Sequence, residues 1–209
     1  MVAKRSDSTK EHWQSVYSSK SAQDVGWFQA QHEVSIEFIN NSEIAKDARI
    51  LDVGSGATTL LDDLLKEGYS NIMAMDISAS ALAVSKQRLA DLITWEVADI
   101  THTLDIEENS IDLWHDRAVL HFFTSSMEKQ GYLENLKKVV KGGGFVLIET
   151  FSPEGAPQCS GLDLQRYDEE MLELFLGSDF ELIMFRRHIH LTPSGSERPY
   201  ISTLFKRRE

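Results

Sequence analysis

RILDVGSG, the stretch Arg49–Gly56, joins a short apolar run to two glycines that flank a serine. An apolar run of this kind predicts a buried β-strand, and glycines directly after it predict a tight turn. Glycines also let the backbone approach a ligand closely, at a point where the N-terminus of the next helix faces that ligand. The turn alone is weak evidence for a nucleotide-like ligand, since an ordinary strand-to-helix loop uses the same residues.

Strand patterns and helix patterns alternate along the rest of the chain. Leucines at helical spacing follow Gly56 and end at Gly68, Ser78 and Asp168 are suited to cap helices, and Gly142–Gly144 are expected to end the helix before them. We expect helices over Leu60–Leu65, after Ser78, over Tyr132–Val140 and from Asp168 to Gly177. We expect strands at Arg49–Val53, Asn71–Ile77, Ile93–Val97, Ile111–Trp114, Phe145–Ile148, Phe180–Leu191 and Tyr200–Lys206.

This order predicts an α/β fold with a Rossmann-like, seven-stranded, mostly parallel sheet and helices on both of its faces. The last two strands are separated only by Thr192–Ser196, so they should pair as a C-terminal antiparallel hairpin. The length of 209 residues suits a single domain, 1–209, in which residues 1–45 form an N-terminal helical cap or lid. Ligands of such sheets bind beyond the carboxyl ends of the strands.

The composition limits the classes of partner. A net charge of -12 makes nucleic acid an unlikely partner, because affinity for nucleic acid rests on neutralised phosphates. No apolar run reaches the roughly 18 to 20 residues of a membrane-spanning helix, so we expect no membrane association. The single cysteine, Cys159, and the polar start of the chain predict a cytoplasmic location.

Two aspartates lie where an adenosine would be bound. Asp76 ends the second expected strand, twenty residues beyond Gly56, where a carboxylate can accept both ribose hydroxyl hydrogens. Asp99 ends the third expected strand, where it can receive the adenine amino group or orient a backbone amide. The alternatives are a solvated loop aspartate for Asp76 and a helix cap for Asp99.

The chain resembles the class I S-adenosylmethionine-dependent methyltransferases over nearly its whole length, from Ile50 to the terminal hairpin. The family's first motif falls on Leu51–Gly56, its motif after strand four on Asp112–Arg117, and its glycines before strand five on Gly143–Leu147. The resemblance implies S-adenosyl-L-methionine as the cofactor. The residues expected at that cofactor are Tyr17, Asp52, Gly54, Ser55, Gly56, Thr58, Asp76, Ile77, Asp99, Ile100 and His115.

Two threonines depart from related patterns. The family often has a third glycine where this chain has Thr58, which asks for a slightly different turn. A dinucleotide-binding turn would need glycine in place of Thr59, and this mismatch counts against an NAD-dependent oxidoreductase.

The residues after the fourth strand are the acceptor-side candidates. His115, Asp116 and His121 are the expected catalytic residues, because an imidazole and a carboxylate can deprotonate or orient an acceptor, and Arg117 lies beside them. The alternative is an ion pair between Asp116 and Arg117 with packed histidines. We expect no metal site, since His188 and His190 have no evident third ligand.

An aromatic N-terminal segment resembles the lids of small enzymes in this family, with Tyr17 the residue best suited to contact the cofactor. The function expected is therefore methyl transfer to an unidentified acceptor, with a small molecule favoured over a protein lysine. The alternative is a protein that binds S-adenosylmethionine without catalysis. The sequence leaves the acceptor atom and the oligomeric state open.

Overall fold

The computed structural model describes residues 2–19 and 21–209, with side chains from residue 8 onward. One seven-stranded sheet has the order β3-β2-β1-β4-β5-β9-β8, in which β9 runs antiparallel to both of its neighbours and the other pairings are parallel. Its strands are β1 (Arg49–Val53), β2 (Asn71–Asp76), β3 (Thr94–Val97), β4 (Ile111–Arg117), β5 (Val140–Phe151), β8 (Phe180–Leu191) and β9 (Glu197–Arg207). The predicted Rossmann-like sheet and its terminal hairpin are confirmed.

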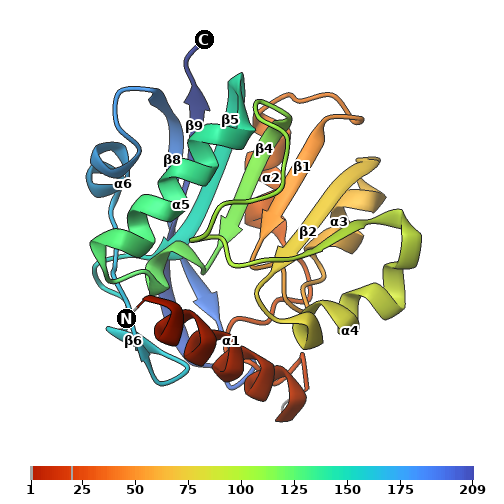
Figure 1. The fold of residues 1–209 in the computed structure, drawn as a ribbon, viewed down its shortest axis with the longest axis vertical. Helices are drawn as coiled ribbons and strands as arrows, with labels where there is room; N and C mark the ends of the chain where they lie inside the picture. The colour runs from red at the N-terminus through yellow and green to blue at the C-terminus, as the bar shows by residue number, and fades with distance from the viewer. Residues whose placement is uncertain (1, 20) are drawn as a thin grey trace.

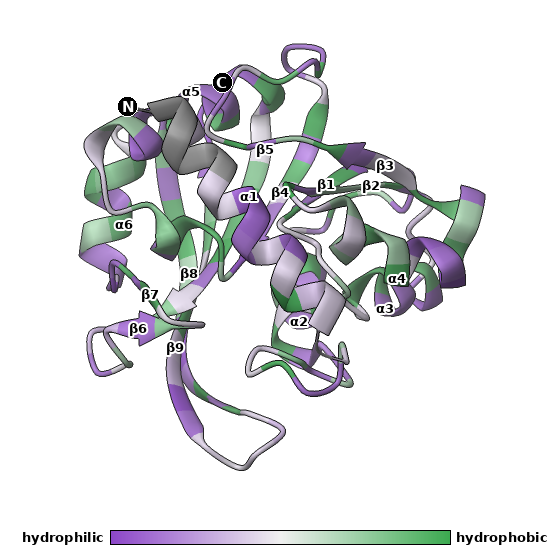
Figure 2. Cartoon of the chain, turned by 60° about the horizontal axis from the view of Figure 1, so that its bottom comes forward, coloured by the Kyte–Doolittle hydropathy of each residue, from purple (hydrophilic) through white to green (hydrophobic). Residues whose placement is uncertain are grey.

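Helices cover both faces of this sheet (Figure 1). They are α1 (Val2–Ser19), α2 (Glu33–Asn41), α3 (Leu60–Lys66), α4 (Ala79–Leu89), α5 (Ser126–Val139) and α6 (Glu169–Leu176). Apolar side chains of α2, α3 and α4 pack on one face of the sheet, and those of α5 and α6 pack on the other. Successive residues of a strand point to opposite faces, so Leu51 and Ile50 belong to different cores. Hydrophobic stretches accordingly run along the central strands (Figure 2).

The expected helix caps are present. The side chains of Ser78 and Asp168 accept hydrogen bonds from backbone amides in the first turns of α4 and α6, and Ser125 and Glu128 form a capping box at the start of α5. Gly68 and Gly177 follow α3 and α6 with positive φ.

One local prediction was wrong. Gly142–Gly144 do not end a helix: α5 ends at Val139, and the glycines lie inside β5, which pairs with β4 across a register shift. Glycine inside a strand often accompanies such an irregularity. The stretch after β5 contains a short antiparallel ribbon of β6 (Gln158–Cys159) and β7 (Leu162–Asp163).

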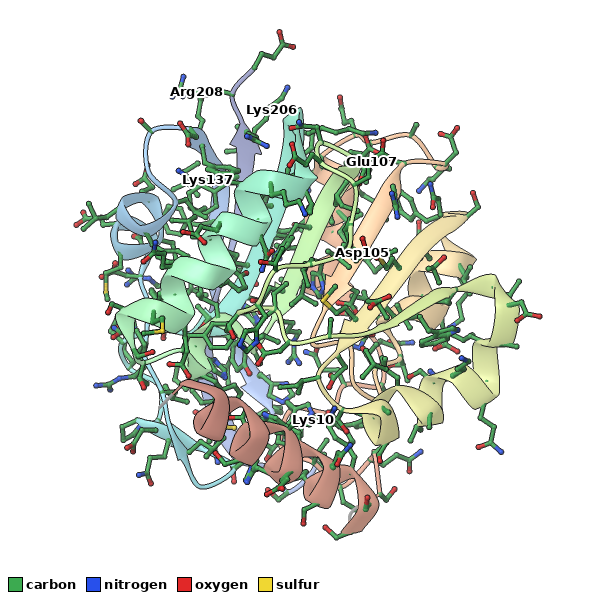
Figure 3. The ribbon with its side chains drawn as sticks, viewed as in Figure 1. Lys10, Asp105, Glu107, Lys137, Lys206 and Arg208 are labelled. Carbon is green, nitrogen blue, oxygen red and sulfur yellow. The ribbon has the colours of Figure 1, made fainter. Side chains whose placement is uncertain are left out.

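The strand order reverses between β1 and β4, which is where ligands of open α/β sheets bind. In Figure 1, α1 lies across the carboxyl ends of β1, β2 and β4. Lys10 lies on α1, whereas Lys137, Lys206 and Arg208 lie near the opposite end of the sheet (Figure 3). The fold therefore places the N-terminal segment, and not this basic group, at the expected binding edge.

Candidate active site

The turn after β1 depends on its glycines. Gly54 and Gly56 have φ values of 63° and 53°, in the left-handed region that glycine adopts without strain. A Cβ atom on Gly54 would lie 2.0 Å from Cγ2 of Val119, and one on Gly56 would lie 2.5 Å from the hydroxyl of Tyr17. Neither position has room for a side chain.

Asp76 braces this turn from the end of β2. Its Oδ2 accepts a hydrogen bond from the Gly56 amide at 2.9 Å, and its Oδ1 accepts one from the Ser78 amide at 2.8 Å. Burial raises the pKa of Asp76 to about 6, although the two amides favour its charged form. The carboxyl group also lines the larger of the two cavities described below.

The larger cavity has a volume of about 490 Å³ and opens along the ends of β1, β2, β3 and β4. Asp76, Ile77, Asp99 and Ile100, all predicted cofactor contacts, line it together. Asp99 Oδ1 accepts hydrogen bonds from the amide and the hydroxyl of Thr101. The volume is within the range of about 300 to 1,000 Å³ that small-molecule and cofactor sites occupy.

Aromatic side chains from distant segments line the same cavity. They are Trp13 and Tyr17 of α1, Trp27 of the following loop, and Phe122 and Phe123 after β4. Trp13 meets Trp27 and Phe122 edge to face, with ring centroids 5.6 and 5.1 Å apart. Arg117 and Cys159 complete this aromatic end.

A second cavity of about 50 Å³ lies beside the glycine turn, lined by Asp52, Ser55, Thr58, His115 and others. Gly54, Tyr17, Trp27 and Arg117 line both cavities, so the two adjoin. Among the described residues, seven buried side-chain atoms have no hydrogen-bond partner. Four of them belong to residues of the small cavity: His32 Nδ1, Asp52 Oδ2, Ser55 Oγ and Arg117 Nη2. Buried polar groups rarely stay unpaired, so this concentration marks a site for a polar ligand group.

Behind the small cavity, His115 lies between two carboxylates. Its Nδ1 is 2.6 Å from Asp52 Oδ1 and its Nε2 is 3.2 Å from Glu149 Oε1. Burial disfavours the charged ring, but the bonds to Asp52 and Glu149 outweigh that effect and raise the pKa of His115 to about 9. Burial opposes ionisation of Glu149 as well, yet His115 holds its pKa well below the ordinary value. The ring is therefore an imidazolium at neutral pH, and neither of its nitrogens can take a proton.

Asp116 and His121 lie away from the wall of the larger cavity. Asp116 accepts hydrogen bonds from the amides of Val119 and Leu120 and from the hydroxyl of Tyr132, so it fixes the loop after β4. His121 is fully buried, with its Nδ1 3.2 Å from Thr150 Oγ1, and burial lowers its pKa to about 3. None of the three expected acceptor-side residues, His115, Asp116 and His121, lines the larger cavity, and their catalytic role stays a prediction.

Several residues of the site were not predicted from the sequence. Glu149 and His32 are the most informative of them, since both are buried polar groups at the small cavity or directly behind it. A charged residue inside the apolar run of β5 was the available signal for Glu149, because a buried charge needs a partner. His32 lies in an irregular loop whose path the sequence does not indicate.

In the described part of the chain, no three His, Cys, Asp or Glu side chains are grouped as ligands for a metal ion. None of the described helices combines the length and hydropathy that a membrane crossing requires.

Comparison with known proteins places this site in a family. Residues 51–148 match the family model described as a methyltransferase domain. EEF1A lysine methyltransferase 2 of mouse is 35% identical in an alignment that covers 67% of this chain and 64% of that protein. The human protein is 30% identical, with 67% and 66% covered. A malonyl-[acyl-carrier protein] O-methyltransferase of Marinomonas is 28% identical over 62% of this chain and 48% of its own length. The chain thus spans about two thirds of the length of the lysine methyltransferases it matches.

Solved structures share the fold. A SAM-dependent methyltransferase from Anabaena variabilis superposes with a TM-score of 0.74 at 13% identity, over 97% of this chain and 95% of that one. A 1,6-didemethyltoxoflavin-N1-methyltransferase from Burkholderia thailandensis, solved with S-adenosylhomocysteine, gives 0.69 at 17% identity, over 97% and 85%. With the matched domain, the related sequences and the shared fold in agreement, the chain belongs to the class I S-adenosylmethionine-dependent methyltransferases.

Proposed function

We propose that this protein transfers the methyl group of S-adenosylmethionine to a small acceptor held at the aromatic end of the larger cavity. One observation carries the proposal: a small cavity with four unpaired polar atoms adjoins a cavity large enough for an adenosine, across a turn that has no room for side chains. One continuous ligand with a polar, zwitterionic end and a nucleoside end fits this arrangement.

The four unpaired atoms match an amino-acid group. Asp52 Oδ2 is suited to accept from the ammonium group of the cofactor's methionine part, with Nδ1 of His32 as a second acceptor. Burial lowers the pKa of His32 to about 3, so its ring is neutral and can accept through one nitrogen. Arg117 Nη2 and Ser55 Oγ are donors suited to the carboxylate. The residues present therefore fit the group.

The nucleoside end fits the predicted residues. Asp76 offers a carboxylate to the ribose hydroxyls, and Ile77 and Ile100 offer apolar contacts beside Asp99 for the adenine.

When bound, the cofactor supplies a methyl group on a positively charged sulfur, which a nucleophile displaces. The chain's own contribution is mainly placement, which can lower a barrier by roughly 7 to 11 kcal/mol. The aromatic faces of Trp13, Trp27 and Phe122 suit a cation and keep water from the reacting atoms. No histidine is among the described residues that line this cavity, so any base that acts on the acceptor there would be a carboxylate such as Asp99 or Glu128.

We also propose that residues 1–45 form a lid within a single domain, 1–209. The Tyr17 hydroxyl accepts a hydrogen bond from Trp27 Nε1 at 3.0 Å and lies against Gly56, 2.5 Å from where a Cβ would be, so α1 packs on the glycine turn. Trp27 is anchored in turn, because its carbonyl accepts a hydrogen bond from Arg117. Entry and release of the cofactor would require α1 to lift away from this turn.

Protein lysine is the second candidate acceptor, favoured by the relatives named EEF1A lysine methyltransferase 2. A single lysine side chain is narrow enough to reach the aromatic end from outside, and the net charge of -12 favours a cationic partner. The relative named malonyl-[acyl-carrier protein] O-methyltransferase supports an acceptor other than a protein lysine. A cytoplasmic location stays a prediction from the single cysteine.

Transfer of tritium from S-adenosyl-[methyl-³H]methionine tests the proposal and separates the acceptor classes. The wild-type protein is incubated with a metabolite extract and, separately, with lysate proteins. Label in small molecules supports the first candidate, and label in proteins that survives acid hydrolysis as methyl-lysine supports the second. Gly54→Ala should transfer nothing, whereas Gly143→Ala, which has positive φ and open space around it, should match the wild type. Label in neither fraction would contradict methyl transfer.

A further inference from the structure

Five polar side chains form one buried hydrogen-bonded network on the α2 face of the sheet. Asp52 of β1 and His115 of β4 are register partners, and Glu149 of β5 and Ser202 of β9 are register partners. His115 reaches Asp52 with one ring nitrogen and Glu149 with the other, at 2.6 and 3.2 Å. The hydroxyls of Ser202, at 2.6 Å, and of Ser35 in α2 donate to the two oxygens of Glu149. All five residues are buried, with at most 3% of their surface exposed to solvent.

This network ends at one oxygen atom that has no hydrogen-bond partner. Every carboxylate oxygen in it has a partner except Asp52 Oδ2, which belongs to the wall of the small cavity. With both carboxylates charged and His115 an imidazolium, Asp52, His115 and Glu149 together carry one net negative charge. Glu149 Oε1 has the His115 ring and the Ser35 hydroxyl as partners, and Oε2 has the Ser202 hydroxyl, so the unpaired acceptor in this set is at Asp52.

We propose that Glu149 is a positioning residue for the amino-acid end of the cofactor: through His115 it fixes Asp52 with one oxygen directed at the ammonium group and keeps the set of three residues negative. This inference rests on the proposed cofactor site. It gives Glu149, which does not line either cavity, a role in binding that acts through two intervening side chains.

The charged groups around His115 determine the expected pH dependence. Asp52 and Glu149 stabilise its charged form, and Asp116, adjacent in the sequence, is also negative. Arg117 and the neutral His32 face the same cluster, and Asp76 faces Asp52 from β2. If Glu149 loses its charge, His115 keeps one carboxylate partner instead of two, and the pKa of His115 should fall below its wild-type value.

Glu149→Gln separates this role from a purely structural one. Two pH values are chosen on either side of the pH at which the variant's His115 loses its proton, which ¹⁵N NMR of its ring gives. At the lower one His115 is charged, the set is neutral, and S-adenosylhomocysteine should bind about tenfold more weakly than to the wild type. At the higher one His115 is deprotonated, the set is negative again, and the difference should shrink to within about threefold. Comparison with the wild type at each pH cancels titration of the ligand's own amine.

Two controls accompany this calorimetric titration. 5′-Methylthioadenosine lacks the amino-acid end, so its affinity should change less than about twofold in the variant. Ser202→Ala removes a hydrogen bond to Glu149 but no charge, and its ratio to the wild type should be the same at both pH values.

Equal losses for both ligands, or a loss that does not depend on pH, would overturn the proposal. If Glu149→Gln does not fold, ¹⁵N NMR of the histidine rings in the wild type decides instead, with the His115 signal assigned by its absence in His115→Gln. Both ring nitrogens should carry protons at neutral pH, and a neutral ring would overturn the proposal. A wild-type protein that binds no S-adenosylhomocysteine would refute the proposed function itself, which is a different result.

Discussion

Replacing Gly54 with alanine should destabilise the protein through two separable effects. The φ value of 63° is left-handed, which is unfavourable for alanine by about 1–2 kcal/mol. The new Cβ would also lie 2.0 Å from Val119 Cγ2, and relief of such overpacking costs about 1–3 kcal/mol more. We therefore expect the free energy of unfolding to fall by about 2–5 kcal/mol, measured by urea denaturation, with loss of S-adenosylhomocysteine binding in calorimetry.

The chain offers matched controls for each effect. Gly68 has a φ of 90° and no atom within 4 Å of its missing Cβ, so Gly68→Ala should show the backbone effect alone, about 1–2 kcal/mol. The three atoms nearest to a Cβ on Gly54 all belong to Val119, so Gly54→Ala combined with Val119→Ala should relieve the clash while leaving the backbone effect. The reasoning is refuted if Gly54→Ala is no more destabilising than Gly68→Ala, or if truncation of Val119 relieves nothing once its own effect is subtracted.

Variants at three further positions test other parts of the site. Asp76→Ala should weaken S-adenosylhomocysteine binding about 10- to 150-fold through lost charge-assisted hydrogen bonds, and a change below about twofold would point to a bracing role only. In the wild type, the same calorimetric affinity should fall as the pH drops below about 6, because Asp76 becomes protonated there and loses its charge, whereas Asp76→Asn should remove this dependence. Tyr17→Phe removes the acceptor of the Trp27 indole hydrogen bond, which joins α1 to the loop after it, so stopped-flow measurements should give a several-fold faster release of S-adenosylhomocysteine, and an unchanged rate would count against the lid. Tyr132→Phe should lower the free energy of unfolding by about 2–4 kcal/mol, because it removes the donor to Asp116 and the acceptor of the Trp114 indole, without changing the affinity for S-adenosylhomocysteine; a selective loss of affinity would mean that Asp116 acts at the cofactor.

The fold could be predicted because its local signals agree with one another. Apolar runs that end in glycine or in a capping residue identify strand and helix limits, and the bounds of Phe180–Leu191 were predicted to the residue. Gly142–Gly144 misled the prediction because glycine is read as a helix terminator, whereas here the glycines accommodate an irregular pairing within β5.

The cofactor side of the site was more predictable than the acceptor side. Gly54, Asp76 and Asp99 follow strand ends in order, and the carboxyl ends of parallel strands meet at one edge. His115 has the spacing of an acceptor residue, but strand pairing turns it toward Asp52 and Glu149, and no local pattern shows which face of a strand a polar residue occupies when both faces are buried. Burial and pairing therefore had to come from the structure.

A crystal structure with S-adenosylhomocysteine would show directly whether one ligand occupies both cavities. The ligand should span both cavities, with its ammonium group within hydrogen-bond distance, about 3 Å, of Asp52 Oδ2 and its carboxylate at Arg117. Its ribose should lie at Asp76 and its sulfur should face Trp13 and Trp27. An amino-acid end outside the small cavity, with Asp52 Oδ2 still unpaired, would contradict the account.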